Sequence, residues 1–289
     1  MPNPVEGFLA HRPRLFGLAY RMLGSRADAE DVLQDAYLRW QTGRRDELES
    51  PEAWLVTVVT RLSIDRLRSA KVEREAYTGP WLPEPLVAPD PEVPERSLEL
   101  ADDISQAFLV MLERLAPEER AVFLLREVFD ADYPEVAQML GKSESACRQM
   151  LHRAKERVRQ QRPRFQVNPE AHKRLLARFA VAAASGDQEA LRRLFAEDVS
   201  FTADGGGKVK STTKPIQGAE RVMRLFWAIN RRVGGHLSYR EATINGQPGL
   251  LRFYDGALDA TMSFVTDGER ILDVYLVRNP DKLQHIHVA

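Results

Sequence analysis

Residues 133–159 read YPEVAQMLGKSESACRQMLHRAKERVR, which is the pattern of two helices joined by a tight turn at Gly141–Ser143. In the second predicted helix, small and apolar residues recur at helical spacing and should face inward: Ala146, Cys147, Met150, Leu151, Ala154 and Val158. Two helices with this layout are typical of the helix-turn-helix motif, in which the second helix enters the major groove of DNA.

The outward positions of the second predicted helix are polar and mostly basic. We expect the DNA-contacting residues to be Ser145, Arg148, Gln149, His152, Arg153 and Lys155. Between Lys142 and Arg164 there are eight Lys or Arg and two acids, a local net charge of +6 in a chain whose total is −1. This excess suits contact with phosphates. The alternative is a solvated basic face on an ordinary helical hairpin.

The composition is that of a globular protein. The chain has 289 residues, enough for two or three domains with their own cores, and 44% hydrophobic with 29% charged residues. No apolar run approaches the roughly 18 residues of a membrane span, and the N-terminus lacks a signal-peptide core, so we expect a cytoplasmic protein. The single cysteine, Cys147, excludes an internal disulfide and is expected to pack as a small apolar side chain.

The first 75 residues predict three helices. Gly24 ends the first, and Ser25 caps a second that runs to Trp40 with an acidic outer face. Ser50 and Pro51 start a third helix, whose outer face is basic. The acidic face suits a basic protein surface, although a solvated amphipathic helix is the alternative.

Three segments resemble, in this order, the conserved segments of bacterial extracytoplasmic-function (ECF) RNA polymerase sigma factors. Residues 28–40 resemble the helix of sigma domain two that binds core RNA polymerase. Residues 51–68 resemble the helix that opens and reads the minus-ten promoter element, and residues 133–155 resemble the minus-thirty-five-binding helices of sigma domain four. Three ordered segments are far more specific than one helix-turn-helix.

The resemblance implies roles for individual residues. Contacts with core polymerase fall on Asp28, Asp31, Gln34, Asp35, Arg39 and Trp40, and minus-ten contacts fall on Arg61, Asp65, Arg66 and Arg68. Many family members have Asn at the position of Arg61, so we expect a phosphate contact there rather than a base contact. Arg44 and Arg45 lie in the loop 41–49 between the two helices, where we expect them to help hold flipped bases.

Residues 76–96 form a predicted linker with six prolines between Pro80 and Pro94. Proline removes a backbone donor and fixes φ, so an extended, semi-rigid spacer is expected rather than a helix or a central strand. The stretch Trp81-Leu82-Pro83-Glu84-Pro85 is expected to dock into a groove in polyproline form. An isolated, exposed aromatic residue is the alternative. Residues 97–165 should then form a four-helix unit that begins with a helix over 102–114 and ends with the helix-turn-helix.

Residues 169–289 predict a mixed pattern of helices and strands. Helices are expected over 169–184, 187–195 and 219–231, and strands over 199–203, 237–244, 250–254, 260–265 and 270–277. Asn245-Gly246, Asp255-Gly256 and Asp267-Gly268 are turn signals between strands. We expect a curved antiparallel sheet with helices closing one side. This arrangement resembles the SnoaL-like (NTF2-like) cone fold, which is fused to sigma domains in the SigJ-like subgroup.

The expected fold class is therefore multidomain, with two all-α sigma domains followed by an α+β cone. The expected domains are sigma domain two at 1–75, the linker at 76–96, sigma domain four at 97–165 and the SnoaL-like domain at 169–289. Three motifs mark the subgroup: Trp81-Leu82-Pro83-Glu84-Pro85, Asp204-Gly205-Gly206-Gly207-Lys208 and Asn279-Pro280-Asp281-Lys282-Leu283. The resemblance implies that the added domain is a built-in regulator in contact with the linker and the sigma domains. We expect the three motifs to meet, with Lys208 and Lys282 pairing with Glu84.

The function that this resemblance implies is transcription initiation by a protein that binds core RNA polymerase and promoter DNA. It requires no cofactor, no metal and no covalent chemistry, and the free protein is expected to be a monomer. One alternative is a helix-turn-helix regulator with a ligand-sensing domain. Another is a SnoaL-like cyclase or isomerase fused to DNA-binding segments. Candidates for its acid–base chemistry, by residue type alone, are Asp204, Asp255, Asp259, His236 and Tyr239.

Overall fold

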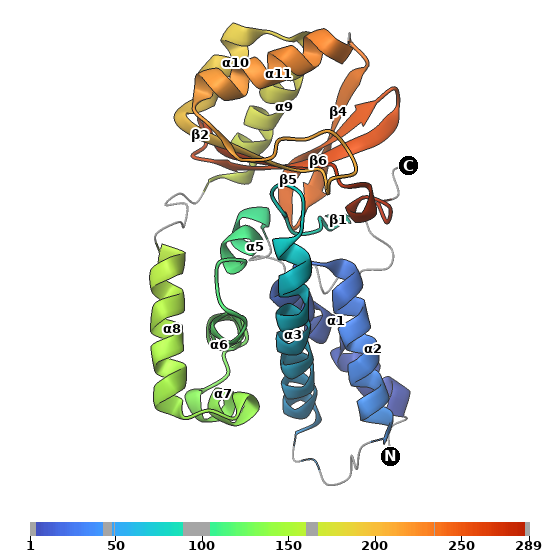
Figure 1. The fold of residues 1–289 in the computed structure, drawn as a ribbon, viewed down its shortest axis with the longest axis vertical. Helices are drawn as coiled ribbons and strands as arrows, with labels where there is room; N and C mark the ends of the chain where they lie inside the picture. The colour runs from blue at the N-terminus through green and yellow to red at the C-terminus, as the bar shows by residue number, and fades with distance from the viewer. Residues whose placement is uncertain are drawn as a thin grey trace. The chain divides into compact units, whose positions relative to one another are not determined.

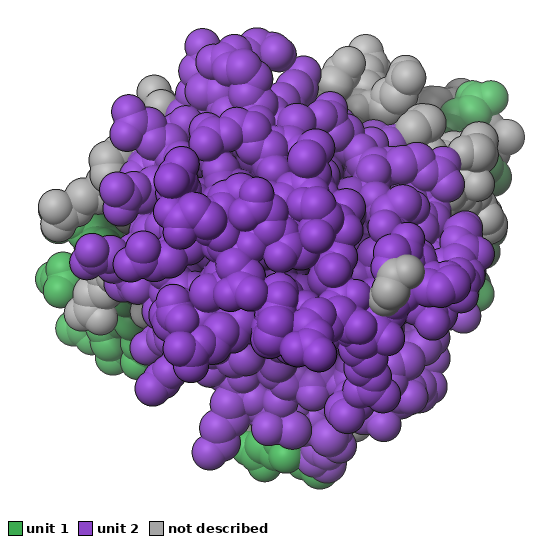
Figure 2. Space-filling model, turned by 90° about the horizontal axis from the view of Figure 1, so that it is seen from above, with its two compact units in different colours: residues 1–75, 91–104, 108–162 green, residues 76–90, 105–107, 163–289 purple. Residues whose placement is uncertain are grey.

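The computed structural model describes residues 4–42, 48, 50–88, 105–159, 167–233 and 235–286. The chain divides into two compact units, drawn in two colours in Figure 2. Unit 1 comprises residues 1–75, 91–104 and 108–162. Unit 2 comprises residues 76–90, 105–107 and 163–289. The first part of the linker thus belongs to the same unit as the C-terminal domain.

Unit 1 is helical (Figure 1). Its helices are α1 (Pro4–Leu23), α2 (Arg26–Thr42), α3 (Pro51–Glu75), most of α5 (Gln106–Leu112), α6 (Pro117–Glu127), α7 (Tyr133–Leu140) and α8 (Glu144–Arg159). α1 packs on α2 and α3, and α3 also packs on α6 and α7. The two sequence segments that resemble sigma domains two and four therefore form one packed unit in this structure.

The predicted helix boundaries in unit 1 are largely confirmed. The hydroxyl of Ser25 accepts a hydrogen bond from the Asp28 N–H at 3.2 Å, and the hydroxyl of Ser50 accepts one from the Ala53 N–H at 3.2 Å. Gly141 ends α7 with φ of 62°, a left-handed conformation that glycine adopts without strain.

One helix in unit 1 differs from expectation. α5 ends at Leu112 rather than Arg114, because Arg114 and Leu115 already make turn-type hydrogen bonds to Met111 and Leu112. Residues 102–104 of the expected helix lie outside the described residues.

Unit 2 contains a sheet whose strand order is β1-β4-β5-β6-β7-β2-β3. The strands are β1 (Val87–Ala88), β2 (Phe195–Asp204), β3 (Ile216–Gln217), β4 (Leu237–Ile244), β5 (Gln247–Tyr254), β6 (Ala257–Thr266) and β7 (Ile271–Val277). The successive pairs from β4 to β7 are antiparallel, as expected. Asn245 and Asp255 have positive φ in the turns that follow β4 and β5, which confirms the two turn signals.

Three helices cover one face of this sheet (Figure 1). They are α9 (Pro169–Ser185), α10 (Gln188–Leu194) and α11 (Ala219–Val233). Phe179 of α9 is fully buried, and its ring lies 5.1 Å from the rings of both Phe226 on α11 and Phe264 on β6. This aromatic cluster fixes the helices over the sheet, with large apolar rings at the centre of the core.

The sheet differs from the expected one in two respects. β2 pairs with β7 in parallel, so the sheet is mixed rather than wholly antiparallel, and β2 begins at Phe195, where a helix end was expected. In addition, the linker contains strand β1, whose Val87 pairs with Ile244 at the edge of the sheet. Both features join segments that are distant in the chain, and local patterns do not encode such pairings. Among the described residues, no helix combines the length and apolar character needed to cross a membrane.

Candidate functional site

The expected DNA-reading face of α8 is exposed. The outer side of the helix carries Ser145, Arg148, Gln149, His152, Arg153 and Lys155, and the expected apolar stripe is buried except for Ala146, which is half-buried. The Arg148 guanidinium donates to Glu144 at 2.8 Å and lies 4.2 Å from the centre of the Tyr133 ring. Arg148 is therefore held at the start of α8, the part of a recognition helix that reads base edges. Its contact with DNA stays a prediction.

Part of the basic face has partners within unit 1. Arg153 and Arg157 both pair with Glu119 of α6, at 3.2 and 2.5 Å, and the Glu119 side chain is only 8% exposed. Lys155 pairs with Glu127 at 2.8 Å. The local charge of +6 thus overstates what α8 offers to DNA, since acids of α6 neutralise part of it.

The acidic face of α2 is open over most of its length. Asp31, Gln34, Asp35 and Arg39 are exposed, and Asp28 pairs with Arg66 of α3 at 2.6 Å. The placement of Trp40 on this face is wrong. Its side chain is 5% exposed and its ring lies 5.9 Å from that of Trp54. Trp40 follows Leu33 by seven residues and Ala36 by four, so it continues the buried stripe.

The basic side chains of α3 are exposed, but they make polar contacts with other helices of unit 1. Arg61 donates to the backbone oxygens of Met139, at 2.7 Å, and Gln138, at 3.3 Å, which are carbonyls at the C-terminal end of α7. Arg68 pairs with Glu118 at 2.5 Å and with the exposed Asp65 at 3.5 Å. Burial favours a higher pKa for Glu118, but hydrogen bonds from Arg68 and the backbone lower that pKa below its ordinary value. Arg44 and Arg45 lie outside the described residues.

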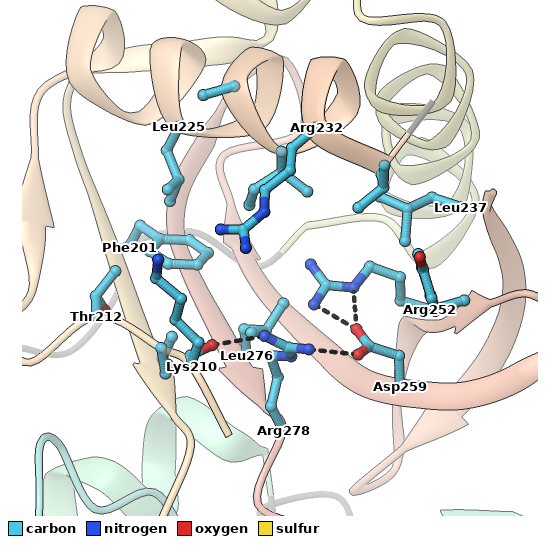
Figure 3. Close-up of a pocket in the computed structure, with 16 residues that line it drawn as sticks. Phe201, Lys210, Thr212, Leu225, Arg232, Leu237, Arg252, Asp259, Leu276 and Arg278 are labelled. Carbon is cyan, nitrogen blue, oxygen red and sulfur yellow. Dashed lines mark hydrogen bonds and ion pairs between the residues drawn. The ribbon is translucent and has the colours of Figure 1, made fainter. Parts of the chain in front are cut away.

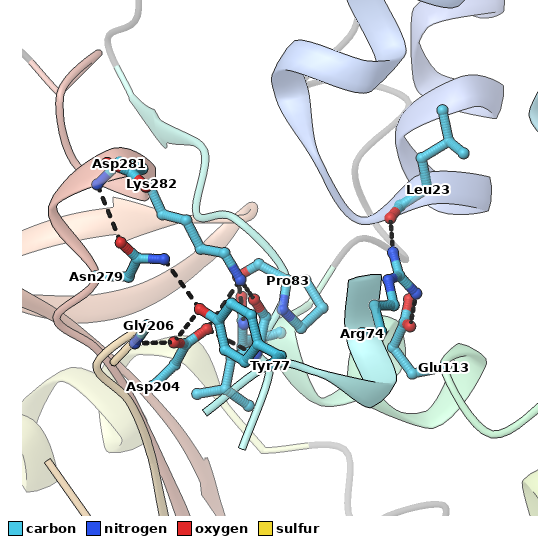
Figure 4. Close-up of polar contacts among 12 residues, drawn as sticks. Leu23, Arg74, Tyr77, Pro83, Glu113, Asp204, Gly206, Asn279, Asp281 and Lys282 are labelled. Atoms are coloured by element: carbon cyan, nitrogen blue, oxygen red, sulfur yellow. Dashed lines mark hydrogen bonds and ion pairs between the residues drawn. The ribbon is translucent and has the colours of Figure 1, made fainter. Parts of the chain in front are cut away.

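A buried arginine joins the two helical segments of unit 1. Arg120 of α6 is 2% exposed and donates to the Met22 backbone oxygen at 2.6 Å and to Glu113 at 2.8 Å. Glu113 also pairs with Arg74 of α3, which donates to the Leu23 backbone oxygen at 2.7 Å (Figure 4). These bonds satisfy the last carbonyls of α1. Sequence reasoning missed this network because it assigned Arg120 and Glu113 no role.

The three marker motifs of unit 2 meet at Asp204, which is fully buried. Its carboxylate accepts hydrogen bonds from the Tyr77 hydroxyl at 2.6 Å, the Leu82 N–H at 2.9 Å and the Lys282 ammonium at 2.8 Å (Figure 4). The N–H of Gly206 donates to the same carboxylate at 3.0 Å. A buried charge is stable only when it is paired and hydrogen-bonded, and Asp204 meets both conditions. The expected meeting of the motifs is confirmed by this geometry.

Lys282 also contacts the linker directly. Its ammonium donates to the Leu82 backbone oxygen at 2.5 Å and lies 4.0 Å from the centre of the Trp81 ring. The expected partner of both lysines was wrong. Lys208 pairs with Asp281 at 2.5 Å and Lys282 pairs with Asp204. The backbone N–H groups of Arg278 and Asn279 donate to the Asp204 backbone oxygen, so η3 (Pro280–Lys282) lies beside the end of β2.

Glu84 instead contacts the C-terminal end of the described chain. Its carboxylate lies 3.1 Å from Nδ1 of His285, and Nε2 of the same ring lies 3.0 Å from the Pro85 backbone oxygen. Leu82, Pro83, Glu84 and Pro85 are all buried, so the expected docking of this stretch is confirmed.

Tyr77 is a member of the site that the sequence did not indicate. Its hydroxyl donates to Asp204 and accepts a hydrogen bond from the Asn279 side-chain amide at 2.9 Å. Burial, followed by the hydrogen bond to Asp204, raises the pKa of Tyr77 far above its ordinary value. The hydroxyl is therefore held in its neutral, donating form.

A second anchor holds the linker at Asn245. The Leu86 N–H donates to the Asn245 side-chain oxygen at 2.7 Å, and the Asn245 N–H donates to the Leu86 backbone oxygen at 2.8 Å. The Asn245 amide donates to Gln106 at 2.8 Å, and the Gln106 amide donates to the Pro83 backbone oxygen at 2.9 Å. Asn245 was predicted only as a turn residue, so its side-chain role had no signal in the sequence. Together, the contacts around Asp204 and Asn245 form the linker-docking site.

The glycines after Asp204 permit this close packing. A Cβ at Gly206, where φ is 63°, would lie 2.4 Å from the Asn279 side-chain nitrogen. A Cβ at Gly205 would lie 2.6 Å from the Val209 backbone oxygen. The expectation that these glycines allow the backbone to turn and approach its neighbours is confirmed.

The five side chains considered for acid–base chemistry do not form one site. Asp204 is buried against the linker, and His236 pairs with Asp255 at an exposed position. Asp259 pairs with Arg252 at 2.5 Å and Arg278 at 2.6 Å. Burial favours a higher pKa for Asp259, but the two arginines lower that pKa below its ordinary value. Burial raises the pKa of Tyr239, which keeps that hydroxyl neutral.

Comparison with known proteins defines the class of protein. Residues 8–72 match the family model for Sigma-70 region 2, and residues 105–158 match that for Sigma-70 region 4. The chain is 38% identical over 290 residues to ECF RNA polymerase sigma factor SigJ of Mycobacterium tuberculosis, covering 96% of this chain and 92% of that protein. It is 30% identical to the probable ECF sigma factor SigI of the same species, covering 97% and 95%.

The structural comparison agrees. The crystal structure of M. tuberculosis SigJ superposes with a TM-score of 0.81 at 34% identity, covering 99% of this chain and all of that one. With its two sigma-70 regions, the chain is a sigma factor, which directs RNA polymerase to promoters for transcription initiation. It belongs to the ECF RNA polymerase sigma factors and resembles SigJ, with helical sigma domains followed by a SnoaL-like domain. Its family comprises transcription initiation factors rather than enzymes.

Proposed function

We propose that the C-terminal domain controls transcription initiation in cis by holding the linker. The observation that carries this proposal is the buried Asp204 carboxylate, which gathers donors from Tyr77, Leu82 and Lys282. Such a charge is costly to bury without its partners, so the docked linker and the folded domain stabilise each other. Because its partners are core polymerase and promoter DNA, we propose that the protein acts in the cytoplasm, as a monomer when free.

The docked linker restrains the reach between the two promoter contacts. Tyr77 lies at the start of the linker and Gln106 lies beyond its end, and both are bonded within unit 2. The minus-ten and minus-thirty-five elements lie about 25 base pairs apart by their names, which is roughly 85 Å at ~3.4 Å per base pair. The backbone between α3 and α5 can span at most about 100 Å when it is fully free. We therefore expect that at least one anchor is released when both contacts are made at once.

The two promoter-binding segments of unit 1 also need to separate from each other before both can bind DNA. Arg61 on the proposed minus-ten helix touches α7 of the proposed minus-thirty-five region at 2.7 Å, and Arg120 ties α6 to the end of α1. We propose that this packed arrangement is the resting form, and that polymerase binding through Asp31, Gln34, Asp35 and Arg39 precedes opening. The domain limits 1–75, 76–96, 97–165 and 169–289 are proposed as the functional divisions of the chain.

Run-off transcription with purified core polymerase and the full-length chain tests this control. Asp204→Asn and Gln106→Ala each loosen one anchor, so both variants should give severalfold more transcript than the wild type at equal concentration. Lys208→Met removes only an exposed pair with Asp281 and serves as the matched control, with unchanged transcript. Transcript yields for both anchor variants that equal or fall below the wild-type yield would contradict the proposal.

A further inference from the structure

Unit 2 contains a cavity whose lining does not include the linker-anchoring residues Tyr77, Asp204, Asn245 and Lys282. Its volume is about 460 Å³, within the usual range for sites that bind small molecules. It lies between α11 and the sheet, and its walls are mainly apolar, with Phe201, Leu225, Ile229, Leu237 and Leu276 among them (Figure 3). An apolar cavity of this size suits a ligand with a body of one or two fused rings.

The polar side chains of the cavity are predominantly cationic. Lys210, Arg232, Arg252 and Arg278 line it together with a single acid, Asp259, which gives a net charge of +3. Asp259 pairs with both Arg252 and Arg278, and so it offsets one of the two positive charges at the sheet. Within the described parts of the chain, Lys210 and Arg232 have no such carboxylate partner. Figure 3 shows Arg232 reaching from α11, and Lys210 reaching from the loop opposite, into the space between them.

The loop that carries Lys210 also has unsatisfied hydrogen-bonding groups. The hydroxyls of Ser211 and Thr212 are buried with no hydrogen-bond partner among the described residues. Buried polar groups normally have partners, so an acceptor brought near this loop would satisfy groups that the protein itself leaves unpaired. The two cations of the cavity favour an anion that accepts hydrogen bonds.

We propose that this cavity binds a small organic carboxylate with an apolar ring system. The carboxylate would lie between Arg232 and Lys210, and the rings would lie against Phe201, Leu225 and Leu276. Arginine and lysine both donate to carboxylates, whereas a neutral analogue of the same shape gains only the apolar contact. Charge therefore determines which ligands the cavity accepts.

The same cavity adjoins the linker-docking site through two short segments. The loop with Lys210 and Thr212 also lies close to the linker, since even a Cβ added at Gly79 would lie 3.4 Å from the Thr212 backbone oxygen. Arg278 donates to the Lys210 backbone oxygen at 2.6 Å, and the next residue, Asn279, donates to Tyr77. A bound carboxylate that holds Lys210 in place would stabilise the docked linker. This regulatory step rests on the proposed role of the linker, whereas ligand binding does not.

Binding is tested with 1-naphthoate and the neutral 1-naphthalenemethanol, titrated calorimetrically into the full-length protein. We expect 1-naphthoate to bind, and Arg232→Gln and Lys210→Met to weaken it about tenfold each. Arg231→Gln is the matched control, since Arg231 stacks on Trp227 outside the cavity lining and should leave affinity unchanged. No binding of 1-naphthoate, equal binding of the alcohol, or equal affinity in Arg232→Gln would overturn the proposal.

Coupling to the linker is tested by hydrogen exchange of residues 77–88 with and without 1-naphthoate. At a 1-naphthoate concentration near the wild-type Kd, exchange of the Leu82 and Leu86 amides should slow measurably in the wild type and much less in Arg232→Gln. Unchanged exchange in a wild-type protein that binds 1-naphthoate would overturn the coupling. That result would leave both the binding site and the transcriptional role of the linker standing, so the two failures are distinguishable.

Discussion

At the scale of single residues, the most important contact of the linker-docking site is the buried ion pair of Asp204 and Lys282. Asp204 is fully buried and Lys282 is 11% exposed, whereas the nearby pair of Lys208 and Asp281 is more than half exposed at both ends. Breaking a buried pair leaves an uncompensated charge in a region of low dielectric constant, while an exposed pair is screened by water. Lys282 therefore contributes much more than Lys208 to the stability of the docked linker.

The first prediction compares these two lysines. Lys282→Met should lower the free energy of opening at the docked linker by about 3–5 kcal/mol, because it strands the Asp204 charge. Lys208→Met should lower it by at most about 1 kcal/mol. Hydrogen exchange of the Leu82 amide, which donates directly to Asp204, measures both values. Equal effects of the two substitutions would show that the buried pair stabilises the docked linker no more than the exposed pair does.

The second prediction concerns alkaline pH and Tyr77. Its folded-state pKa lies above the ordinary value of 10.0, so the folded state favours the neutral hydroxyl. This contribution to stability is fully present below pH 10 and is lost as the pH rises above 10 towards the folded-state pKa. Thermal unfolding of the wild type and of Tyr77→Phe should therefore differ most below pH 10, and the difference should shrink above it. A difference that is constant from pH 8 to 11 would argue against the buried hydroxyl.

At the scale of elements, the helix-turn-helix divides its basic residues between two tasks. Arg148 lies at the start of α8, stacked on Tyr133, while Lys155 lies farther along and pairs with Glu127. Residues at the start of a recognition helix read base edges, and residues farther along contact the phosphate backbone.

The third prediction follows from this division. Arg148→Ala should relax sequence preference at the minus-thirty-five element, with a loss of about 1–3 kcal/mol on the cognate sequence alone. Lys155→Ala should weaken binding to all sequences similarly and reduce the salt slope by about 1. Promoter binding by polymerase holoenzyme, measured against salt on cognate and scrambled elements, separates the two effects. The same loss on both sequences for both variants would contradict the division.

Local sequence signals predicted most elements because they depend on near neighbours. The Gly141 turn, the Ser25 and Ser50 caps and the hairpin turn at Asn245 each follow from a few adjacent residues. The parallel pairing of β2 with β7 and the linker strand β1 were not predicted, since they join segments that are far apart in the chain.

The linker-docking site was likewise only partly predictable from the sequence. The three motifs were predicted to meet from a family resemblance, but the partners of Lys208 and Lys282 depend on a three-dimensional register that the motifs do not contain. Tyr77, Gln106 and His285 carried no signal, because their roles arise only when the linker lies on the sheet.

At the scale of the whole molecule, the linker both docks on the C-terminal domain and joins the two promoter-binding segments. Tyr77, at the start of the linker, and Gln106, beyond its end, are both bonded within unit 2. The promoter elements that the two segments bind lie roughly 85 Å apart on DNA at ~3.4 Å per base pair. We propose that docking opposes promoter engagement, and that polymerase and DNA together supply the free energy that releases the linker. In this proposal, control in cis results from competition for a single segment of chain.

The central claim is that the linker leaves the C-terminal domain when the protein engages a promoter. Hydrogen exchange of the full-length chain, free and in the open complex with core polymerase and promoter DNA, tests it most directly. We predict that the Leu82 and Leu86 amides are protected in the free protein and that at least one of them loses protection in the open complex, while the β5 and β6 amides stay protected. Retention of full protection at both linker amides in the open complex would contradict the account.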